Sequence, residues 1–309
     1  MKKLIALSIV AACVCGSFMS ISQAAKKKKG PPPKLELTGA VKHRFLGSSY
    51  SHKGGVVYIV DKEGKIEWEV PAPRAQDIFM LKGDKVLFNT NRGAKIVSVK
   101  DKKVLWEYKH ESKARFEIHS CQPLDNGNVL ISVCGESKVI EVDKDGKVAK
   151  TISFKDVSKC AGNGHMELRD ALKTKRGTYL VAFLMEGVIR EFDADSKVLR
   201  TVKLDCFKAK GVSTVQELKN GNLVVGGGYG RNVVEIDKND KVVWSLTEKD
   251  IEGLNLGYVA TAKRLKNGNT MVSLYHGSYA FFEVDKDKKI VWSIKGGPFR
   301  ATTAIEYLD

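Results

Sequence analysis

The sequence predicts an all-β fold: a six-bladed β-propeller of four-stranded antiparallel blades, with the ring closed by a C-terminal strand that joins the N-terminal blade. Three observations support this prediction. A hydrophobic, acidic, turn, lysine, hydrophobic pattern occurs six times in 309 residues, its copies are spaced like propeller blades, and no convincing helical segment separates them. With 43% hydrophobic and 28% charged residues, the chain can bury a substantial core, which excludes a disordered or collagen-like protein.

Each repeat predicts an outer β-hairpin. In Tyr58–Trp68, for example, two apolar runs flank a turn built from Asp, Gly and Lys. The aspartates of these turns recur from blade to blade, so we assign them to turn capping rather than to acid or base catalysis. One lysine per repeat aligns, and these lysines lie about 45 residues apart on average, the length of a blade. They are Lys65, Lys103, Lys147, Lys197, Lys241 and Lys289.

A second hairpin precedes the first in most repeats. Segments such as Leu124–Leu130 and Leu218–Val224 carry Asn-Gly, which supplies the positive φ angles of a two-residue turn. The ends of the chain complete the count, because residues 42–70 supply only three strands and Ala301–Leu308 resembles an innermost one. We therefore expect the C-terminal strand to complete the first of six blades.

The N-terminus resembles an export signal. Lys2 and Lys3 precede the apolar stretch Leu4–Ile21, and a small-x-small cleavage site ends at Ala24, which predicts a signal peptide over residues 1–24. Lipidation of Cys13 in a lipobox-like sequence remains an alternative. We expect a periplasmic or secreted protein with no transmembrane segment after cleavage.

A basic, proline-rich tether is predicted over residues 25–41, followed by a single propeller domain over residues 42–309. The formal net charge is +16, and much of it lies in the four lysines of the tether that end at Lys29, together with Lys34. We interpret the tether as a solubilising spacer, with weak attraction to anionic surfaces as the alternative. Export argues against a nucleic-acid partner, and we expect a monomer.

The repeats resemble those of secreted bacterial β-propellers of the PQQ-like or quinoprotein type. The motif Asp-x-x-Gly-Lys-x-x-Trp is complete at Asp61, Gly64, Lys65 and Trp68, and partial in the last two repeats. The resemblance implies that these residues dock neighbouring blades. It implies a fold and no cofactor, since the chain has no recognisable set of quinone ligands, and the cofactor is left unspecified.

A second resemblance is to the six-bladed propeller of bacterial arylsulfotransferases. It rests on the segment His119–Leu130, in which a histidine is followed by an Asn-Gly-Asn strand connection. In those enzymes a channel histidine is the nucleophile, so the resemblance implies a weak candidate catalytic role for His119. A full catalytic set cannot be transferred to this sequence.

The candidate site lies on the propeller face that carries the long loops, because binding groups concentrate on such loops. Six equivalent positions at the start of the innermost strands should ring the central channel: Gln76, His119, Arg169, Ser213, Ala260 and Thr303. Such a ring could hold an anionic or sugar-like ligand. The predicted ligand-binding residues are Gln76, Arg92, His119, His165, Arg169, Tyr229, Arg231, Tyr275, His276 and Arg300. Glu167 is a further candidate beside His165.

Four cysteines remain after the predicted cleavage. Cys160 and Cys206 occupy equivalent loops of adjacent blades, so we predict a disulfide between them in an oxidising compartment. A bond between Cys121 and Cys134 is disfavoured by their diagonal register. No metal is predicted, because the cysteines and histidines match no compact zinc-ligand spacing.

These observations predict an exported binding or scaffold protein that engages a small molecule, glycan or protein on its loop-rich channel face. The alternative is an enzyme with its site at the channel mouth, either an arylsulfotransferase-like transferase or a quinoprotein-like oxidoreductase. An enzyme should gather buried, mutually hydrogen-bonded polar groups at one channel mouth, whereas a scaffold should present a broad, shallow face.

Overall fold

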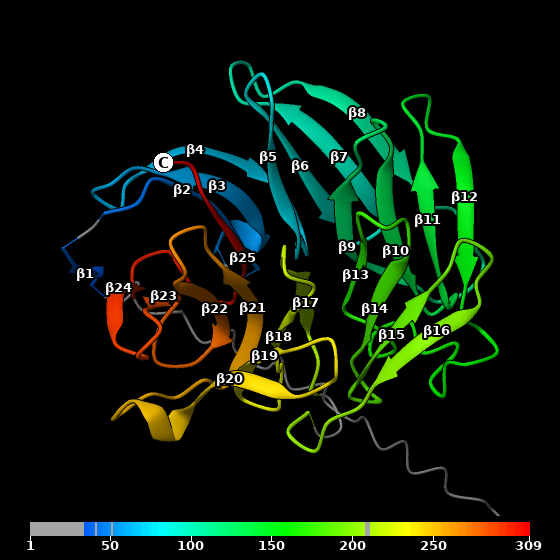
Figure 1. Cartoon of the computed structure of the whole chain (residues 1–309). Coiled ribbons are helices and arrows are strands. Elements are labelled where there is room, and N and C mark those ends of the chain that lie inside the picture. The colour runs from blue at the N-terminus through cyan, green and yellow to red at the C-terminus, as the bar shows by residue number, and fades with distance from the viewer. Residues whose placement is uncertain (1–33, 41, 51, 208–210) are drawn as a thin grey trace, which may run out of the picture. The chain divides into compact units, whose positions relative to one another are not determined.

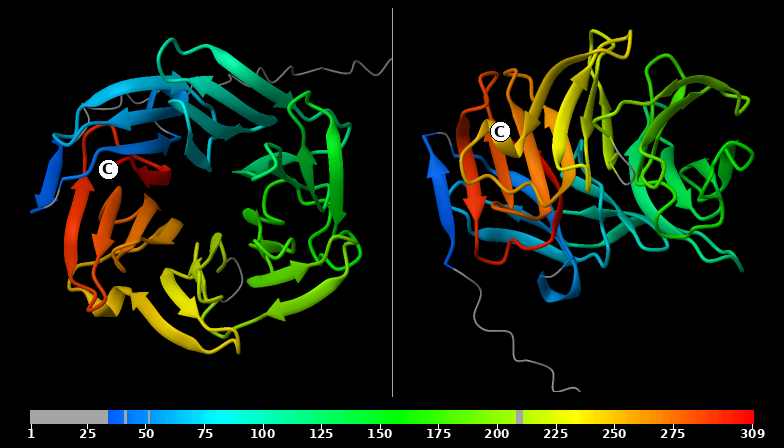
Figure 2. Two further views of the ribbon diagram at one scale, coloured as in Figure 1. Left: turned by 45° about the horizontal axis from the view of Figure 1, so that its top comes forward. Right: turned by 90° about the horizontal axis from the view of Figure 1, so that it is seen from below.

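The computed structural model describes residues 34–40, 42–50, 52–207 and 211–309. The predicted signal peptide and most of the predicted tether lie outside these residues. Within them, six antiparallel sheets are arranged as the blades of a ring (Figures 1 and 2), so the predicted six-bladed β-propeller is confirmed. No helix in this described part of the chain is long and apolar enough to cross a membrane.

Each blade has four strands, which follow in order from the innermost to the outermost. The first three blades are β25 (Thr302–Tyr307), β2 (Phe45–Ser49), β3 (Val56–Val60) and β4 (Ile66–Pro71); β5 (Ile78–Leu81), β6 (Lys85–Thr90), β7 (Gly93–Ser98) and β8 (Val104–Lys109); and β9 (Glu117–Pro123), β10 (Val129–Cys134), β11 (Lys138–Val142) and β12 (Val148–Ser153). The last three are β13 (Asp170–Lys173), β14 (Tyr179–Phe183), β15 (Val188–Phe192) and β16 (Val198–Val202); β17 (Thr214–Glu217), β18 (Leu223–Gly226), β19 (Asn232–Ile236) and β20 (Val242–Thr247); and β21 (Tyr258–Arg264), β22 (Thr270–His276), β23 (Phe281–Val284) and β24 (Ile290–Lys295). Two short 3-10 turns, η1 (His52–Gly54) and η2 (Glu248–Asp250), lie between strands.

The ring closes as the sequence predicts. β25, the last strand of the chain, pairs antiparallel with β2, with Phe45 opposite Tyr307. In Figure 2 the red C-terminal strand lies inside the blue strands of the first blade. The N-terminal and C-terminal parts of the propeller therefore share one sheet, in which β25 covers the inner edge of β2.

A strand not expected from the sequence extends the sixth blade. β1 (Glu36–Gly39) pairs with the outer edge of β24, with Leu37 opposite Ile294. The lysines and prolines that precede β1 predict a tether that continues through these residues. Instead, Leu35 and Leu37 pack against the core between the sixth and first blades, so these residues belong to the folded unit.

The outer hairpins are closed by capped aspartate turns. In the first blade, Asp61 Oδ1 accepts hydrogen bonds from the backbone N–H groups of Glu63 and Lys65, at 3.0 and 2.8 Å. Gly64 has φ +84°, a conformation that glycine adopts without strain. The same carboxylate contacts recur in four other blades, which confirms the turn-capping assignment. The four equivalent aspartates are Asp143, Asp193, Asp237 and Asp285.

Tryptophans from these repeats dock neighbouring blades. The indole N–H of Trp106 donates to the backbone carbonyl of Asp143 in the next blade, at 3.2 Å. The indole N–H of Trp244 donates to the backbone carbonyl of Lys286 in the same way. Six buried apolar clusters lie between successive blades, and they form the core that holds the ring together.

Candidate functional site

The innermost strands begin around a cavity of about 170 Å³ at one mouth of the central channel. All six blades or their loops contribute to it. Its wall is formed by Tyr50, Gln76, Asp77, His119, His165, Arg169, Asp170, Ser213, Thr214, Tyr229, Tyr258, Ala260, Tyr275 and Thr303. The six equivalent positions predicted to ring the channel are all among these residues, since each blade presents the start of its inner strand in the same way.

Irregular pairing helps to position three of the six. A β-bulge interrupts the β9–β10 ladder between its Ile118 and Cys121 pairs, at His119. Similar shifts occur at Ala260 on β21 and at Thr303 on β25. A bulge adds a residue to one strand and redirects its side chains, which is a common device beside functional sites.

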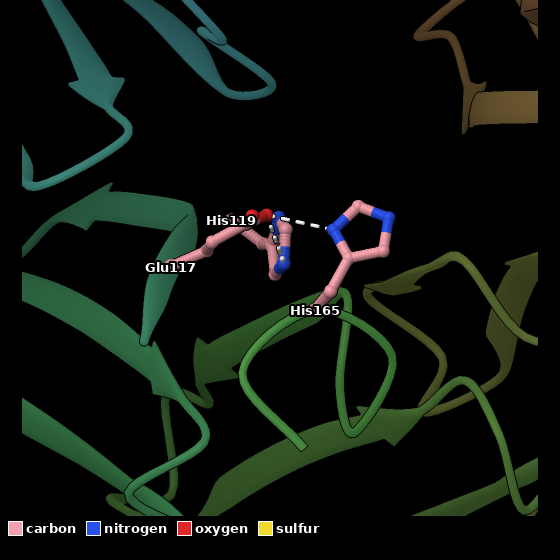
Figure 3. A group of neighbouring side chains, drawn as sticks. All are labelled: Glu117, His119 and His165. Carbon is pink, nitrogen blue, oxygen red and sulfur yellow. Dashed lines mark hydrogen bonds and ion pairs between the residues drawn. The ribbon is translucent and has the colours of Figure 1, made fainter. Parts of the chain in front are cut away.

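Figure 3 shows the most concentrated polar group, in which Glu117 and His119 from β9 meet His165 from the loop before β13. Glu117 Oε2 lies 2.7 Å from His165 Nδ1 and 3.6 Å from His119 Nε2. The second oxygen, Oε1, accepts a hydrogen bond from the guanidinium of Arg74 at 2.8 Å. The carboxylate of Glu117 thus joins two histidines and an arginine.

Arg169 lies against both histidines. Its Nη1 is 2.9 Å from His119 Nδ1 and 3.0 Å from His119 Nε2, and its Nη2 is 3.4 Å from His165 Nε2. The side-chain amide of Gln76 also contacts His119 Nδ1. Among the residues that the structure describes, no carboxylate forms an ion pair with Arg169, and its buried Nε has no hydrogen-bond partner.

Burial and charge set the protonation of this group. Burial, reinforced by the positive charge of Arg169, holds the pKa of His119 well below its ordinary value, so the imidazole is neutral at neutral pH. Burial acts to raise the pKa of Glu117, but the hydrogen bond and charge of His165 and the charge of Arg74 outweigh it, so this pKa is lowered. The site therefore combines a neutral histidine, a carboxylate and an arginine.

Four tyrosines form an aromatic part of the wall. Tyr229 and Tyr258 make an edge contact with ring centroids 4.6 Å apart, and Tyr50 makes one with Tyr275 at 5.5 Å. Burial raises the pKa of both Tyr50 and Tyr258, and the charge of Arg169 offsets only part of this effect. Both hydroxyls therefore stay protonated. The hydroxyl of Tyr50 donates to the carbonyl of Arg74 at 3.4 Å, whereas that of Tyr258 can donate a hydrogen bond near Arg169.

Asp77 and Asp170 form the acidic part of the wall. Burial and the charge of Asp170 raise the pKa of Asp77 to about 8, and burial raises the pKa of Asp170 to about 6. Each carboxylate accepts a backbone N–H from the next blade, Cys121 for Asp77 and Val215 for Asp170. Residues farther along the inner strands line a second cavity of about 340 Å³ that shares these two aspartates.

Four predicted ligand-binding residues do not line the cavity. Arg92 covers the ring of Phe116, and Arg231 pairs with Glu248 at 2.6 Å. His276 contacts Tyr258 and Tyr275 from outside the cavity wall. The carbonyl of Arg300 accepts a hydrogen bond from the hydroxyl of Ser49, and Arg300 is also absent from the wall.

Two further expectations differ from the structure. Glu167 is fully buried and accepts hydrogen bonds from Ser137, Ser158 and the backbone of Gly135, so it holds loops rather than facing the cavity. The predicted Cys160–Cys206 disulfide is not formed, and all four described cysteines are free thiols. Cys206 packs against the core between the fourth and fifth blades, whereas Cys160 lies in the loop between the third and fourth blades.

Several residues of the wall and of the polar group beside it were not predicted from the sequence. Glu117 precedes His119 by two residues on the same strand, and the two-residue period of a strand could have revealed it. Asp77 and Asp170 directly follow predicted ring positions. Tyr50 and Tyr258 carry no comparable signal, because their inclusion depends on how the loops of the first and sixth blades pack.

Comparisons with known proteins agree with the fold. Residues 53–182 match the family described as outer membrane protein assembly factor BamB. A crystal structure of a protein of unknown function from Bacteroides caccae is 25% identical, with a TM-score of 0.73, and the match covers 86% of this chain and 98% of that one. No curated protein matches.

Two lyase structures are more distant. A streptogramin B lyase is 13% identical with a TM-score of 0.59, and the match covers 84% of this chain and 86% of that one. A catalytically inactive variant of virginiamycin B lyase from Staphylococcus aureus, solved with quinupristin, is 12% identical with a TM-score of 0.58, and the match covers 88% of this chain and 90% of that one. At this level of identity the similarity concerns the fold alone.

Proposed function

We propose that this protein is an exported β-propeller that binds a small organic anion in the cavity at its channel mouth. The observation that carries the proposal is Arg169, whose guanidinium borders the cavity without a carboxylate partner among the described residues. An arginine in such a place is well suited to bind a carboxylate, sulfate or phosphate group. The protonated hydroxyl of Tyr258 supplies a further donor.

The rest of the wall suggests the body of the ligand. A dry cavity of about 150 Å³ accepts benzene in another protein, so a cavity of about 170 Å³ is large enough for one ring. Tyr229, Tyr258 and Tyr275 offer ring faces and edges for such a group. We therefore propose a ligand with a single ring and one anionic group.

Calorimetric titration with a matched series tests this function. Phenyl sulfate, phenyl phosphate and benzoate should bind, phenol should test the ring alone, and inorganic sulfate should test the charge alone. Arg169→Leu should weaken binding by about tenfold or more, because a charge-assisted hydrogen bond is lost. Arg231→Gln removes the same charge outside the cavity and should leave the affinity unchanged. Equal binding by wild type and Arg169→Leu would contradict the proposal.

The proposed location is outside the cytoplasm. Support comes from the N-terminal sequence, with its basic start, apolar stretch and cleavage site, and from the match to a family described as an outer membrane assembly factor. Fractionation of cells that produce the full chain, with sequencing of the mature N-terminus, tests both export and cleavage after Ala24. A mature protein that begins with a lipidated Cys13 would support the lipoprotein alternative.

A second candidate function is catalysis through His119. The cavity has the character expected of an enzyme, because Glu117, His119, His165 and Arg169 are mutually connected at one channel mouth. A neutral imidazole can accept a proton or act as a nucleophile. Transfer of the sulfuryl group from phenyl sulfate to a differently substituted phenol, with release of phenol, would support an arylsulfotransferase-like activity over binding alone if it is lost in His119→Gln while phenyl sulfate still binds.

A further inference from the structure

We propose that Glu117, His119 and His165 form a binding site for a divalent first-row transition metal ion. The donor atoms are Glu117 Oε2, His119 Nε2 and His165 Nδ1. Two histidines and one carboxylate are a common ligand set for zinc and for non-haem iron, with further coordination positions left open. This proposal goes beyond the anion-binding function, because none of the three ligands is the residue on which that function depends.

The spacing of the donor atoms fits one shared ion. All three lie within 4.8 Å of one another, with 2.7 Å between Glu117 and His165 and 3.6 Å between Glu117 and His119. Donors bound at about 2.1 Å to one zinc ion lie about 3 to 3.5 Å apart. Small side-chain rotations therefore bring the three atoms to coordination distance. In the described part of the chain, no other group of three such residues is this compact.

Neighbouring residues orient the ligands. The carboxylate of Glu117 is held through its other oxygen by Arg74, at 2.8 Å. Gln76 contacts Nδ1 of His119, which leaves Nε2 as the nitrogen that faces Glu117. Contacts of this kind fix the orientation of metal ligands in known sites. His119 and His165 also line the cavity, so a bound ion would present its remaining coordination positions to a ligand there.

Arg169 competes with the metal. Its Nη1 lies 3.0 Å from His119 Nε2, the atom that would coordinate the ion, and its positive charge repels a second cation. Metal binding therefore requires the guanidinium to move away from His119. The wild-type protein should bind the metal more weakly than a variant that lacks this charge.

Calorimetric titration with Zn²⁺ tests the proposal, using the full chain without a tag and after treatment with a chelator. The visible absorption of bound Co²⁺ reports the ligand set. We expect one ion per chain. His165→Ala and Glu117→Gln should each weaken binding by at least about tenfold, since each removes a ligand without altering the core. His52→Ala is the matched control: His52 pairs with Glu69 at 3.3 Å and has no third ligand, so its loss should change nothing.

Arg169→Leu separates this proposal from anion binding. It should tighten Zn²⁺ binding by about tenfold or more, because a repelling charge is removed, and it should weaken binding of phenyl sulfate. Loss of anion binding without any Zn²⁺ binding would overturn the metal site and leave the proposed function standing. Zn²⁺ binding that persists unchanged in both His165→Ala and Glu117→Gln would also overturn it, since the ion would then be held elsewhere.

Discussion

The imidazole of His43 lies flat on the ring of Tyr307, with centroids 3.8 Å apart and planes within 9°. This contact joins the first and last parts of the propeller. Nε2 of His43 is 3.2 Å from Glu283 in the sixth blade, and Nδ1 is 2.9 Å from Asp309 at the C-terminus. Ring closure thus includes a stacked pair and two ionisable contacts in addition to the β25–β2 ladder.

The contacts of His43 predict a pH-dependent stability. Burial acts to lower the pKa of His43, but hydrogen bonds to Glu283 and Asp309 outweigh it, so the pKa is raised. Its stabilisation is present below the ordinary value of 6.5 and is lost as pH rises through the raised pKa. Burial acts to raise the pKa of Glu283, but hydrogen bonds from His43 and from other neighbouring side chains outweigh it and lower this pKa to about 2. The stabilisation that these hydrogen bonds give is present above the ordinary pKa of 4.5 and is lost at low pH.

We therefore expect His43→Gln to cost on the order of 1 kcal/mol near pH 5.5 and less near pH 8.5. Urea unfolding at the two pH values measures the difference. His52→Gln, which alters a histidine away from the closure, controls for a general effect of losing an imidazole. An equal cost at both pH values would show that the charge of His43 does not contribute.

Asp77 also predicts a loss of stability with rising pH, in this case because a buried carboxyl group becomes charged. Its folded pKa of about 8 lies above its ordinary value of 3.8, so the folded state loses stability as pH rises between these values. Asp77→Asn keeps an oxygen to accept the N–H of Cys121 and removes this loss. The melting temperature of the variant should exceed that of wild type at pH 8.5 and approach it at pH 4. The control Asp145→Asn alters an exposed turn, and its melting temperature should not differ from that of wild type in this pH-dependent way.

We expect the strand β1 to make a modest contribution to the free energy of unfolding. Removal of residues 34–39 takes away four ladder pairs and the packing of Leu35 and Leu37, at a cost of roughly 1 to 3 kcal/mol. The other four strands of the sixth blade remain, so the variant should fold. Circular dichroism and urea unfolding measure both points, with Lys34→Ala as the control. An unchanged unfolding free energy would mean that the strand is only loosely attached.

We expect the aromatic ring of Tyr258 to contact the ring of the proposed ligand. Tyr258→Ala should weaken phenyl sulfate binding by about three- to tenfold through loss of aromatic contact, whereas Tyr258→Phe should retain most of the affinity. Titration of both variants separates the contribution of the ring from that of the hydroxyl. Equal losses in the two variants would assign the effect to the hydroxyl, through its position near Arg169.

The periodic features of this fold could be predicted from the sequence, and the features set by packing could not. Turn chemistry recurs at Asp61 and its equivalents, so blade number and ring positions such as His119 and Arg169 followed from counting. The strand β1 could not be predicted in this way, because its four residues follow a lysine- and proline-rich segment. Cys160 and Cys206 occupy equivalent places in successive blades, and equivalence in a repeat means separation by a blade rather than contact.

The position of β25 also constrains the order of folding. A chain that is being synthesised from its N-terminus releases the strands β2 to β24 before the inner strand of the first blade exists. Until Thr302–Tyr307 emerge, the nascent molecule is an open arc with the inner edge of β2 unpaired. Ring closure is therefore the final step of biogenesis, and a product cut short within β25 would retain its other blades and an edge exposed to pairing with other chains.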